Sequence, residues 1–441
     1  MKKTYIYILI IILLLPALCA CAGEDPYVPT TRQTVTAPEP GTSYETLAPI
    51  EQTTGTEAQS TAEPKDTTDE TSQAAQTTAA ETEPPAPSGD KASFLFCGDN
   101  LAHDAVLNNA KRFAEGKDQT YDFLPIYSDV EPYIKKADCA VINQESQIAG
   151  DAGKIGGYPR FNTPKQMGED LITLGFDVVT LANNHMLDNG TEGYKNCINY
   201  WKTKPVLSVG AYESKADYDN IRVLDVNGIK VAFLSYTEMI NSGRKAEDGY
   251  ITPLLDEATV KRHVEAAKKV SDVIIAVPHW GKEGSFGVTS TQKQYAALFA
   301  KCGVDVVVGM HSHVPGKIEY IDGTDGKKML CVYSLGNFVS TMEYAADMVG
   351  YMLSFDIVKE NGGFAVRNVV IIPTVTYFVY TASMKYEDRT DLHLYLLSDF
   401  TDELAAKHAY NEHEDAKIRL KELKKFITDN VDKEFLPDYL K

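Results

Sequence analysis

Cysteine is scarce in this chain, which has seven cysteines in 441 residues. Cys19 and Cys21 lie near the N-terminus, and the other five are odd in number and far apart. Most of them sit in apolar surroundings, where a reduced thiol packs as a small hydrophobic side chain. A disulfide framework is therefore excluded, and buried free thiols are expected. The five residues are Cys97, Cys139, Cys197, Cys302 and Cys331.

Basic residues are also in the minority. The chain has 43 Lys and Arg against 62 Asp and Glu, a net charge of −19, and no basic cluster stands out. This balance argues against nucleic acid as a partner. Long apolar runs are missing as well, apart from residues 5–15, which are shorter than the roughly 20 residues that a membrane-spanning helix needs.

That N-terminal run has the features of an export signal. Lys2 and Lys3 precede it, and Leu18-Cys19-Ala20-Cys21 follows in the form of a lipobox. We expect residues 1–20 to be a lipoprotein signal peptide and Cys21 to carry the lipid, which would anchor the protein at the extracytoplasmic face of the cell membrane. Cleavage before Cys19 and a plain signal peptide with incidental cysteines are the two alternatives.

The next segment has almost no large apolar side chains. Residues 22–90 are rich in Thr, Glu, Ala, Pro, Gln and Ser, and contain 13 acidic residues against Arg32 and Lys65. Such a composition buries too little apolar surface to offset the entropy lost on ordering. Residues 21–90 are therefore expected to be a disordered acidic tether.

Past residue 91, short apolar runs alternate with amphipathic stretches, which is typical of an α/β domain with parallel strands. We expect this domain to cover residues 91–385 and a helical extension to cover residues 386–441. The expected strands are 93–97, 139–143, 177–181, 229–236, 272–277, 305–308 and 329–333. The expected helices are 127–136, 164–174, 190–202, 256–270, 291–301 and 414–428.

Two further segments indicate antiparallel pairing. Residues 221–236 read as a hairpin with Asn227-Gly228 as its two-residue turn. Residues 351–358 and 365–375 read as a second antiparallel pair.

Polar clusters follow five of the expected strands. The carboxyl ends of parallel strands share one edge of a sheet, so side chains distant in sequence are expected to meet there. The clusters are Gly98-Asp99-Asn100, Gln144-Glu145-Ser146, Asn183-Asn184-His185 with Asp188, Pro278-His279-Trp280-Gly281, and Gly309-Met310-His311-Ser312-His313.

Each cluster alone is a weak signal, because turns, caps and packed aromatic pairs produce similar patterns. The pair His311 and His313 is stronger, since alternate residues of an extended segment point to the same side. Five clusters at five strand ends indicate a metal site. Carboxylate, imidazole and amide donors without cysteine suit Mn, Fe or Zn, and two ions would allow a bridging carboxylate.

The motifs resemble those of the CapA-type poly-γ-glutamate capsule-synthesis family over residues 92–345. That family is similar to the calcineurin-like metallophosphoesterases, so the resemblance implies a two-sheet β-sandwich flanked by helices. The matching blocks are Gly98-Asp99, Asn143-Gln144-Glu145, Leu181 to Gly190 with its Asn183-Asn184-His185, His279-Trp280-Gly281, Gly309 to His313, and Tyr333-Ser334-Leu335-Gly336-Asn337-Phe338.

The resemblance also implies roles by position. Asp99 and His313 would bind one ion and Glu145 would bridge to the second, with His185 as the general acid and Asp188 orienting it. Asn184, His279 and His311 would hold the second ion. Asn100, His103, Asn143 and Asn337 would line the pocket.

Two departures weaken the first ion position. Leu101 stands where metallophosphoesterases usually have a histidine, and Glu145 replaces an aspartate. A single-ion site, or a fold whose reaction has been lost, are therefore open alternatives unless His103 or Asp104 supplies a ligand.

Three functions follow as hypotheses. The first is a metal-dependent hydrolase or transferase acting on an anionic envelope polymer such as poly-γ-glutamate. The second is a non-enzymatic partner of a membrane-bound polymer synthase. The third is a secreted metallophosphoesterase of general specificity.

Overall fold

A computed structural model describes residues 90–342, 344–381, 385–412 and 417–441. The expected signal peptide, Cys21 and nearly all of the expected tether lie outside these residues. In the described part of the chain, no helix is both long and apolar enough to cross a membrane. The five cysteines beyond the N-terminal region are unpaired, as predicted, and all but Cys302 are buried.

The first sheet has eight strands in the order β14-β13-β12-β1-β2-β3-β4, with β11 also pairing with β1. Strands β1 to β4 run parallel, whereas β12, β13 and β14 form an antiparallel wing. The strands are β1 (Lys91–Asn100), β2 (Cys139–Gln144), β3 (Val178–Thr180), β4 (Leu207–Val209), β11 (Asn337–Val339), β12 (Val349–Glu360), β13 (Gly363–Tyr380) and β14 (Arg389–Leu396).

The second sheet has six strands in the order β5-β6-β7-β8-β10-β9. Its four inner strands are parallel. The predicted hairpin is confirmed between β5 and β6, and Asn227 and Gly228 both have the positive φ that a type I′ turn requires. The strands are β5 (Arg222–Val226), β6 (Ile229–Thr237), β7 (Val273–His279), β8 (Val306–Val308), β9 (Ile318–Asp322) and β10 (Lys328–Val332).

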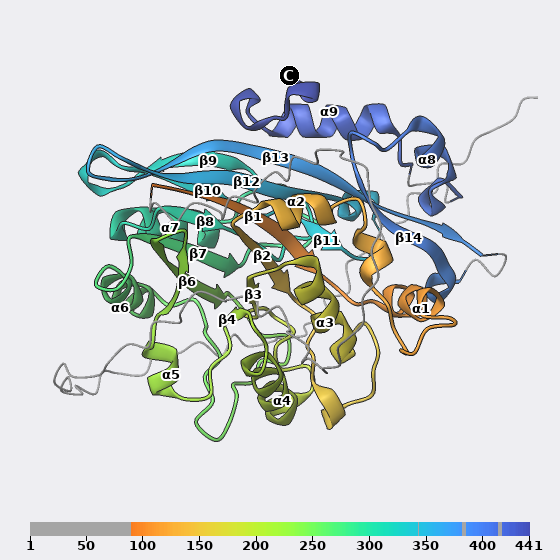
Figure 1. Cartoon of the computed structure of the whole chain (residues 1–441), viewed down its shortest axis with the longest axis horizontal. Helices are drawn as coiled ribbons and strands as arrows, with labels where there is room; N and C mark the ends of the chain where they lie inside the picture. Colours follow the sequence, from red (N-terminus) through yellow and green to blue (C-terminus); the bar gives the residue numbers. More distant parts are fainter. Residues whose placement is uncertain (1–89, 343, 382–384, 413–416) are drawn as a thin grey trace, which may run out of the picture. The chain divides into compact units, whose positions relative to one another are not determined.

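Helices cover the outer surfaces of the sheets, and α9 lies along the outer side of β13 (Figure 1). Helix α7 begins at a capping box between Thr289 and Gln292, which satisfies backbone N–H groups that the first turn leaves free. The helices are α1 (Asp104–Phe113), α2 (Glu131–Lys136), α3 (Lys165–Leu174), α4 (Gly190–Lys202), α5 (Lys215–Asp219), α6 (Glu257–Ala267), α7 (Ser290–Cys302), α8 (Asp402–Lys407) and α9 (Leu420–Asn430).

Strand alternation divides the core into two apolar clusters. In β7, Val273, Ile275 and Val277 join the large cluster that contains residues of both sheets. Ile274 and Ala276 instead face the cluster formed with α6 and α7. Each fully buried aliphatic side chain contributes about 1.5–3 kcal/mol. The same alternation sends His279 toward the space between the sheets and Trp280 toward the helices.

A recurring aspartate sets the register of the parallel strands. The carboxylate of Asp177, just before β3, accepts a hydrogen bond of 2.8 Å from the N–H of Ala140 in β2. Three further aspartates, each just before its own strand, accept from the neighbouring strand in the same way. The pairs are Asp138 with Ser93, Asp272 with Lys230, and Asp305 with Ile274.

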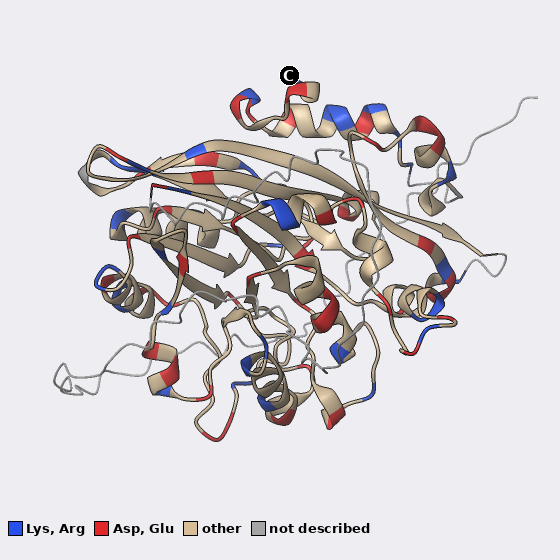
Figure 2. Cartoon of the chain, viewed as in Figure 1, with Lys and Arg blue, Asp and Glu red and all other residues tan. Residues whose placement is uncertain are grey.

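The predicted mixed α/β fold with two sheets and flanking helices is confirmed. Figure 2 shows its charged residues mainly on helices and loops, while the strands are mostly uncharged. The prediction that residues 386–441 are helical is wrong for β14, which pairs with β13. Leu392, Leu394 and Leu396 are buried and alternate with more exposed residues, which is the period-two pattern of a strand with one buried face, and the prediction of charged helices overlooked it. The helix expected over 127–136 is shorter, and part of the 414–428 helix lies outside the described residues.

Asp177 gives a stability prediction. Burial raises the pKa of Asp177 to about 6 in the folded protein, above the value of ~3.9 in unfolded chains. Since the unfolded state then loses its proton first, this group lowers the free energy of unfolding as pH rises from about 4 to about 6. Asp177→Asn keeps an acceptor for Ala140 and removes the charge, so its stability relative to the wild type should rise across that window. Urea unfolding at several pH values measures this difference.

Asp138→Asn is the matched control with the opposite sign. Although burial opposes it, the hydrogen bonds from Ser93 lower the pKa of Asp138. This carboxylate therefore stabilises the fold above its unfolded pKa, and the Asn variant should be less stable at neutral pH. A stability difference for Asp177→Asn that does not vary with pH would contradict the assignment.

Candidate metal centre

Asp99 enters the site at the end of β1 through a close backbone contact. A Cβ atom at Gly98 would lie 2.0 Å from the carbonyl oxygen of Gly336, so only glycine fits there. The Asp99 carboxylate is fully buried and accepts hydrogen bonds from the Asn143 side chain (2.6 Å) and from the His311 backbone N–H (2.9 Å). Asp99 is therefore held in place by two neighbouring strand ends.

Glu145 is the least satisfied polar residue of the site. It follows β2, is fully buried, and neither carboxylate oxygen has a hydrogen-bond partner. Its Oε1 lies 3.6 Å from His279 Nε2 and 3.8 Å from His313 Nε2. Those separations are too long for hydrogen bonds. They suit two ligands of one ion, because atoms that each lie ~2.1 Å from a metal are roughly 3–4 Å apart.

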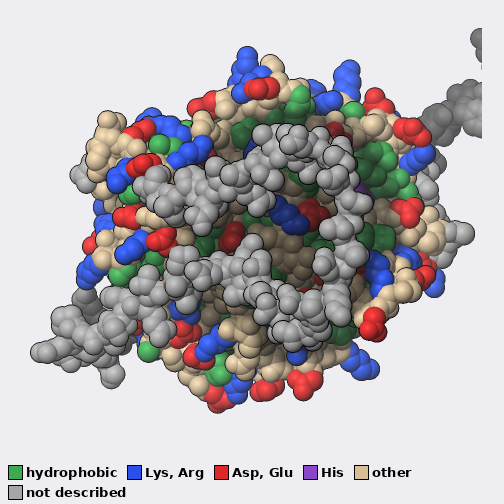
Figure 3. All heavy atoms as spheres, viewed as in Figure 1, with side chains coloured by type: hydrophobic (Ala, Val, Ile, Leu, Met, Phe, Trp, Pro, Cys, Tyr) green, Lys and Arg blue, Asp and Glu red, His purple; other side chains and the backbone are tan. Residues whose placement is uncertain are grey.

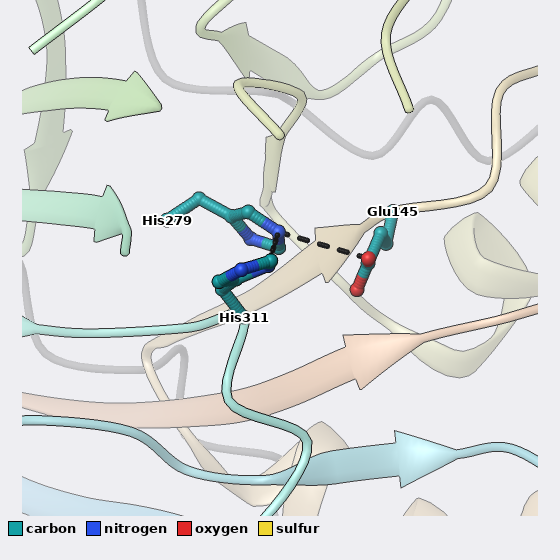
Figure 4. A group of neighbouring side chains, drawn as sticks. All are labelled: Glu145, His279 and His311. Carbon is teal, nitrogen blue, oxygen red and sulfur yellow. Dashed lines mark hydrogen bonds and ion pairs between the residues drawn. The ribbon is translucent and has the colours of Figure 1, made fainter. Parts of the chain in front are cut away.

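The second sheet supplies three imidazoles. His279 Nε2 lies 2.8 Å from Asn184 Oδ1 and 3.1 Å from His311 Nδ1. In Figure 4 the rings of His279 and His311 are close together and face the carboxylate of Glu145. The structure thus brings His279, His311 and Asn184 together, as the sequence predicted.

The prediction that His311 and His313 lie on an extended segment is wrong, however. Their φ angles are 93° and 58°, which are not those of an extended chain. Non-glycine residues adopt this left-handed region at a cost of order 1–3 kcal/mol, and such strain is concentrated at functional sites. Both rings therefore reach the site from strained turns and not, as expected, by alternation along an extended strand.

Asn337 orients His313. The Asn337 amide nitrogen donates to Ser340 Oγ (2.9 Å) and to the backbone carbonyl of Asp347 (3.0 Å), which fixes which end of the amide is oxygen. That oxygen lies 2.9 Å from His313 Nδ1, so Nδ1 carries the proton. The lone pair of His313 is then on Nε2, which faces Glu145. This is the arrangement that metal-binding histidines usually have.

The electrostatics of the site favour bound cations. Burial, and then the negative charge of Glu145, raise the pKa of Asp99 well above its ordinary value, and burial also raises the pKa of Glu145. Burial lowers the pKa values of His279 and His311, which keeps both rings neutral and able to donate a lone pair. Two coupled buried carboxylates are costly unless a cation compensates them.

Two overlapping donor groups fit a divalent ion. In each group the ligand atoms lie within 4.8 Å of one another. Both include Glu145, whose unpartnered oxygens lie between the two. The groups are Asp99, Glu145 and His313, and Glu145, His279 and His311.

Beside these groups lies a second histidine–carboxylate pair. His185 Nδ1 is 2.8 Å from Asp188 Oδ2, which also accepts from the Phe161 N–H. Burial alone would lower the pKa of His185, but the hydrogen bond with Asp188 and the charge of Glu145 raise it overall. The Phe161 ring packs edge-on against His185, with 4.7 Å between centroids.

The other expected pocket residues do not all contact the metal-type donors. Asn143 binds Asp99, but the Asn100 side chain is taken up within the core by Tyr127 and Gln144. His103 accepts from the Thr341 N–H, and burial lowers the pKa of this histidine to about 3.

Leu101 is buried with the core, and Asp104 accepts from the Gly157 N–H, so neither fills the weakened first position.

Sequence reasoning missed two residues of the site. Asn241 follows β6 and lies 3.3 Å from His185 Nε2, while its backbone N–H donates to Asn184. Glu283 lies four residues beyond His279 and forms a third group with His311 and His313. The strand-end rule would have found Asn241 had β6 been included. Glu283 has no such signal in the sequence, because only the path of the loop after β7 places it near His311 and His313.

A groove of about 960 Å³ lies elsewhere and contains none of these residues. It is lined from both sheets, by residues at the opposite, amino-terminal ends of β7 and β8 and by the β12–β13 hairpin. The metal-type donors therefore form a separate, mostly buried cluster.

The fold and the cluster define a two-sheet α/β protein with a carboxylate–imidazole site suited to divalent ions. Residues 93–342 match the family described as bacterial capsule synthesis protein PGA_cap. The chain belongs to this family, which confirms the resemblance seen in the motifs.

Two CapA relatives agree with this assignment. The chain is 28% identical over 280 residues to PGA biosynthesis protein CapA of Bacillus subtilis, covering 62% of this chain and 70% of that protein. It is 28% identical over 246 residues to capsule biosynthesis protein CapA of Bacillus anthracis, covering 54% and 58%. The solved calcineurin-like phosphoesterase YfkN from Bacillus subtilis aligns with 64% of this chain and 90% of its own, at 14% identity and a TM-score of 0.41.

Glu145 gives a prediction about metal and stability. Glu145→Gln removes one of two buried, mutually repelling carboxylates, so in chelator it should be more stable than the wild type by on the order of 1 kcal/mol. With Mn²⁺ at about 100 times its dissociation constant, the wild type should gain roughly 2.7 kcal/mol, and the variant much less. Denaturant unfolding with chelator or Mn²⁺ measures both effects. Equal stabilisation of the two proteins by Mn²⁺ would rule out Glu145 as a ligand.

Proposed function

We propose that this protein is a metal-dependent hydrolase that cleaves a phosphoester or amide-type bond in an anionic polymer of the cell envelope. The observation that carries the proposal is Glu145, a buried carboxylate without a hydrogen-bond partner that lies within 4 Å of the imidazoles of His279 and His313. The polymer class comes from the CapA relatives, whose names refer to poly-γ-glutamate (PGA) and capsule biosynthesis.

The residues of the site have different roles in the proposed reaction. Asp99, His279, His311, His313 and Asn184 would hold two ions of Mn, Fe or Zn, with Glu145 between them. When bound, such ions polarise a phosphoryl or carbonyl oxygen and make a bound water more acidic.

His185 is buried beside this group and delivers the proton to the leaving group, while Asp188 holds its ring through Nδ1. The Asn241 amide nitrogen lies 3.3 Å from Nε2 of the same ring.

Placement at the membrane is part of the proposal. A lipid on Cys21 and the acidic tether of residues 21–90 would hold the domain at the extracytoplasmic face. Because the tether repels a polyanion, affinity must come from the domain. Arg160 and Lys282 are exposed candidates, whereas Lys317 is paired with Glu319. The face in Figure 3 shows basic and acidic side chains interspersed.

Leu101 favours a second candidate. Its side chain is buried and offers no ligand where a histidine was expected, which leaves the first ion position with three donors. A protein that binds one ion without turnover would act as a binding partner of a membrane polymer synthase.

Metal content separates these functions. Full-length protein purified without chelator or an affinity metal should contain close to two equivalents of Mn, Fe or Zn by elemental analysis. One equivalent together with no turnover of phosphoester or amide substrates would favour the binding partner. No metal, and none taken up at micromolar concentrations, would overturn the hydrolase.

His185 gives a kinetic prediction. If it donates the proton to the leaving group, His185→Asn should lower kcat by about 10²–10⁴-fold on a substrate with an alcohol leaving group. A nitrophenolate leaves without protonation, so the loss on that substrate should be much smaller. Metal content should match the wild type in both assays. Equal losses on the two leaving groups would exclude His185 as the acid.

A further inference from the structure

Glu283 is the one exposed carboxylate among the donor groups found in the described residues. It follows His279-Trp280-Gly281 in a loop between β7 and α7, and neither the strand-end pattern nor the motif resemblance pointed to it. A carboxylate oxygen of Glu283 lies within 4.8 Å of ring nitrogens of both His311 and His313. Those two histidines are buried, so the carboxylate approaches them from the solvent side.

The two histidines link Glu283 to both ion positions. His311 also groups with Glu145 and His279, and His313 also groups with Asp99 and Glu145. Glu145 belongs to both inner groups and is fully buried, whereas Glu283 contacts one member of each from outside. The two carboxylates therefore share the same histidines, and Glu283 is the exposed one.

Three contacts hold the loop in this position. The Gly281 N–H donates to Glu238 at 2.9 Å, and the Gly284 N–H donates at 2.9 Å to the carbonyl of Ser312, the residue between the two histidines. Phe286 packs against Phe426 of α9, with 4.7 Å between ring centroids. The backbone on both sides of Glu283 is thus tied to the site and to the C-terminal helix.

We propose that Glu283 is a metal ligand that closes the site on its solvent side. Ligands of one ion at ~2.1 Å each lie at most ~4.2 Å apart, so the separation of up to 4.8 Å between Glu283 and the ring nitrogens of His311 and His313 requires only a small tightening. The inference rests on the proposed function and adds to it, because this carboxylate would supply the donor that Leu101 does not. It would also make the site anionic enough to retain two divalent ions.

Calorimetric titration of metal-free, full-length protein with Mn²⁺ tests this proposal. Glu283→Gln removes the charge, and Glu283→Asp keeps the charge but shortens the side chain. Both should weaken binding of at least one ion by about tenfold or more, as loss of a metal contact does. Glu265→Gln, the same change at an exposed carboxylate of α6 outside the donor groups, should stay within about twofold of the wild type.

The possible results distinguish the proposed role of Glu283 as a ligand from the proposed function of the protein as a hydrolase. Wild-type affinity in Glu283→Asp together with a loss in Glu283→Gln would show a long-range charge effect and overturn ligation. Wild-type affinity in Glu283→Gln would overturn it as well. If the wild-type protein itself binds no Mn²⁺, Fe or Zn, this result would instead contradict the proposed hydrolase function. Circular dichroism of each variant checks that this exposed substitution leaves the fold intact.

Discussion

The register of the parallel strands is the constraint on which the site depends. Four aspartates at the amino ends of β2, β3, β7 and β8 bind the N–H groups of neighbouring strands, which sets how far each strand extends at its carboxyl end. A slip of one residue would turn every side chain to the other face. His279 would then face α7 and Trp280 would enter the space between the sheets. The chemistry at one end of the strands is therefore positioned by hydrogen bonds at the other end.

The site itself opposes folding. Asp99 and Glu145 are buried carboxylates that repel each other, and His311 and His313 occupy strained backbone conformations. The large apolar cluster shared by the two sheets offsets this cost. Destabilising features of this kind persist at functional sites, where selection for activity outweighs selection for stability. Their presence together in one cluster is the physical argument that the cluster binds cations.

The family assignment covers residues 93–342, and all the metal-type donors lie within it. The chain beyond that segment adds to the same fold. Strands β12, β13 and β14 extend the first sheet, and α9 contacts the loop that contains Glu283 through Phe426 and Phe286. The C-terminal region is thus part of one structure with the site. A change in α9 would alter the packing of the loop after β7.

The sequence by itself determined the alternation of strands and helices, the Asn227-Gly228 hairpin and most of the metal-type donors. These depend on local periodicity and on the rule that parallel strands present their carboxyl ends together. It did not show that residues 389–396 form an edge strand, that Glu145 has no partner, or that Glu283 and Asn241 join the site. Those features were decided by the packing of the two sheets and by the paths of the loops between them. The periodicity of a segment shows which of its faces is buried but not which distant segment covers that face, so only the tertiary structure decides these contacts.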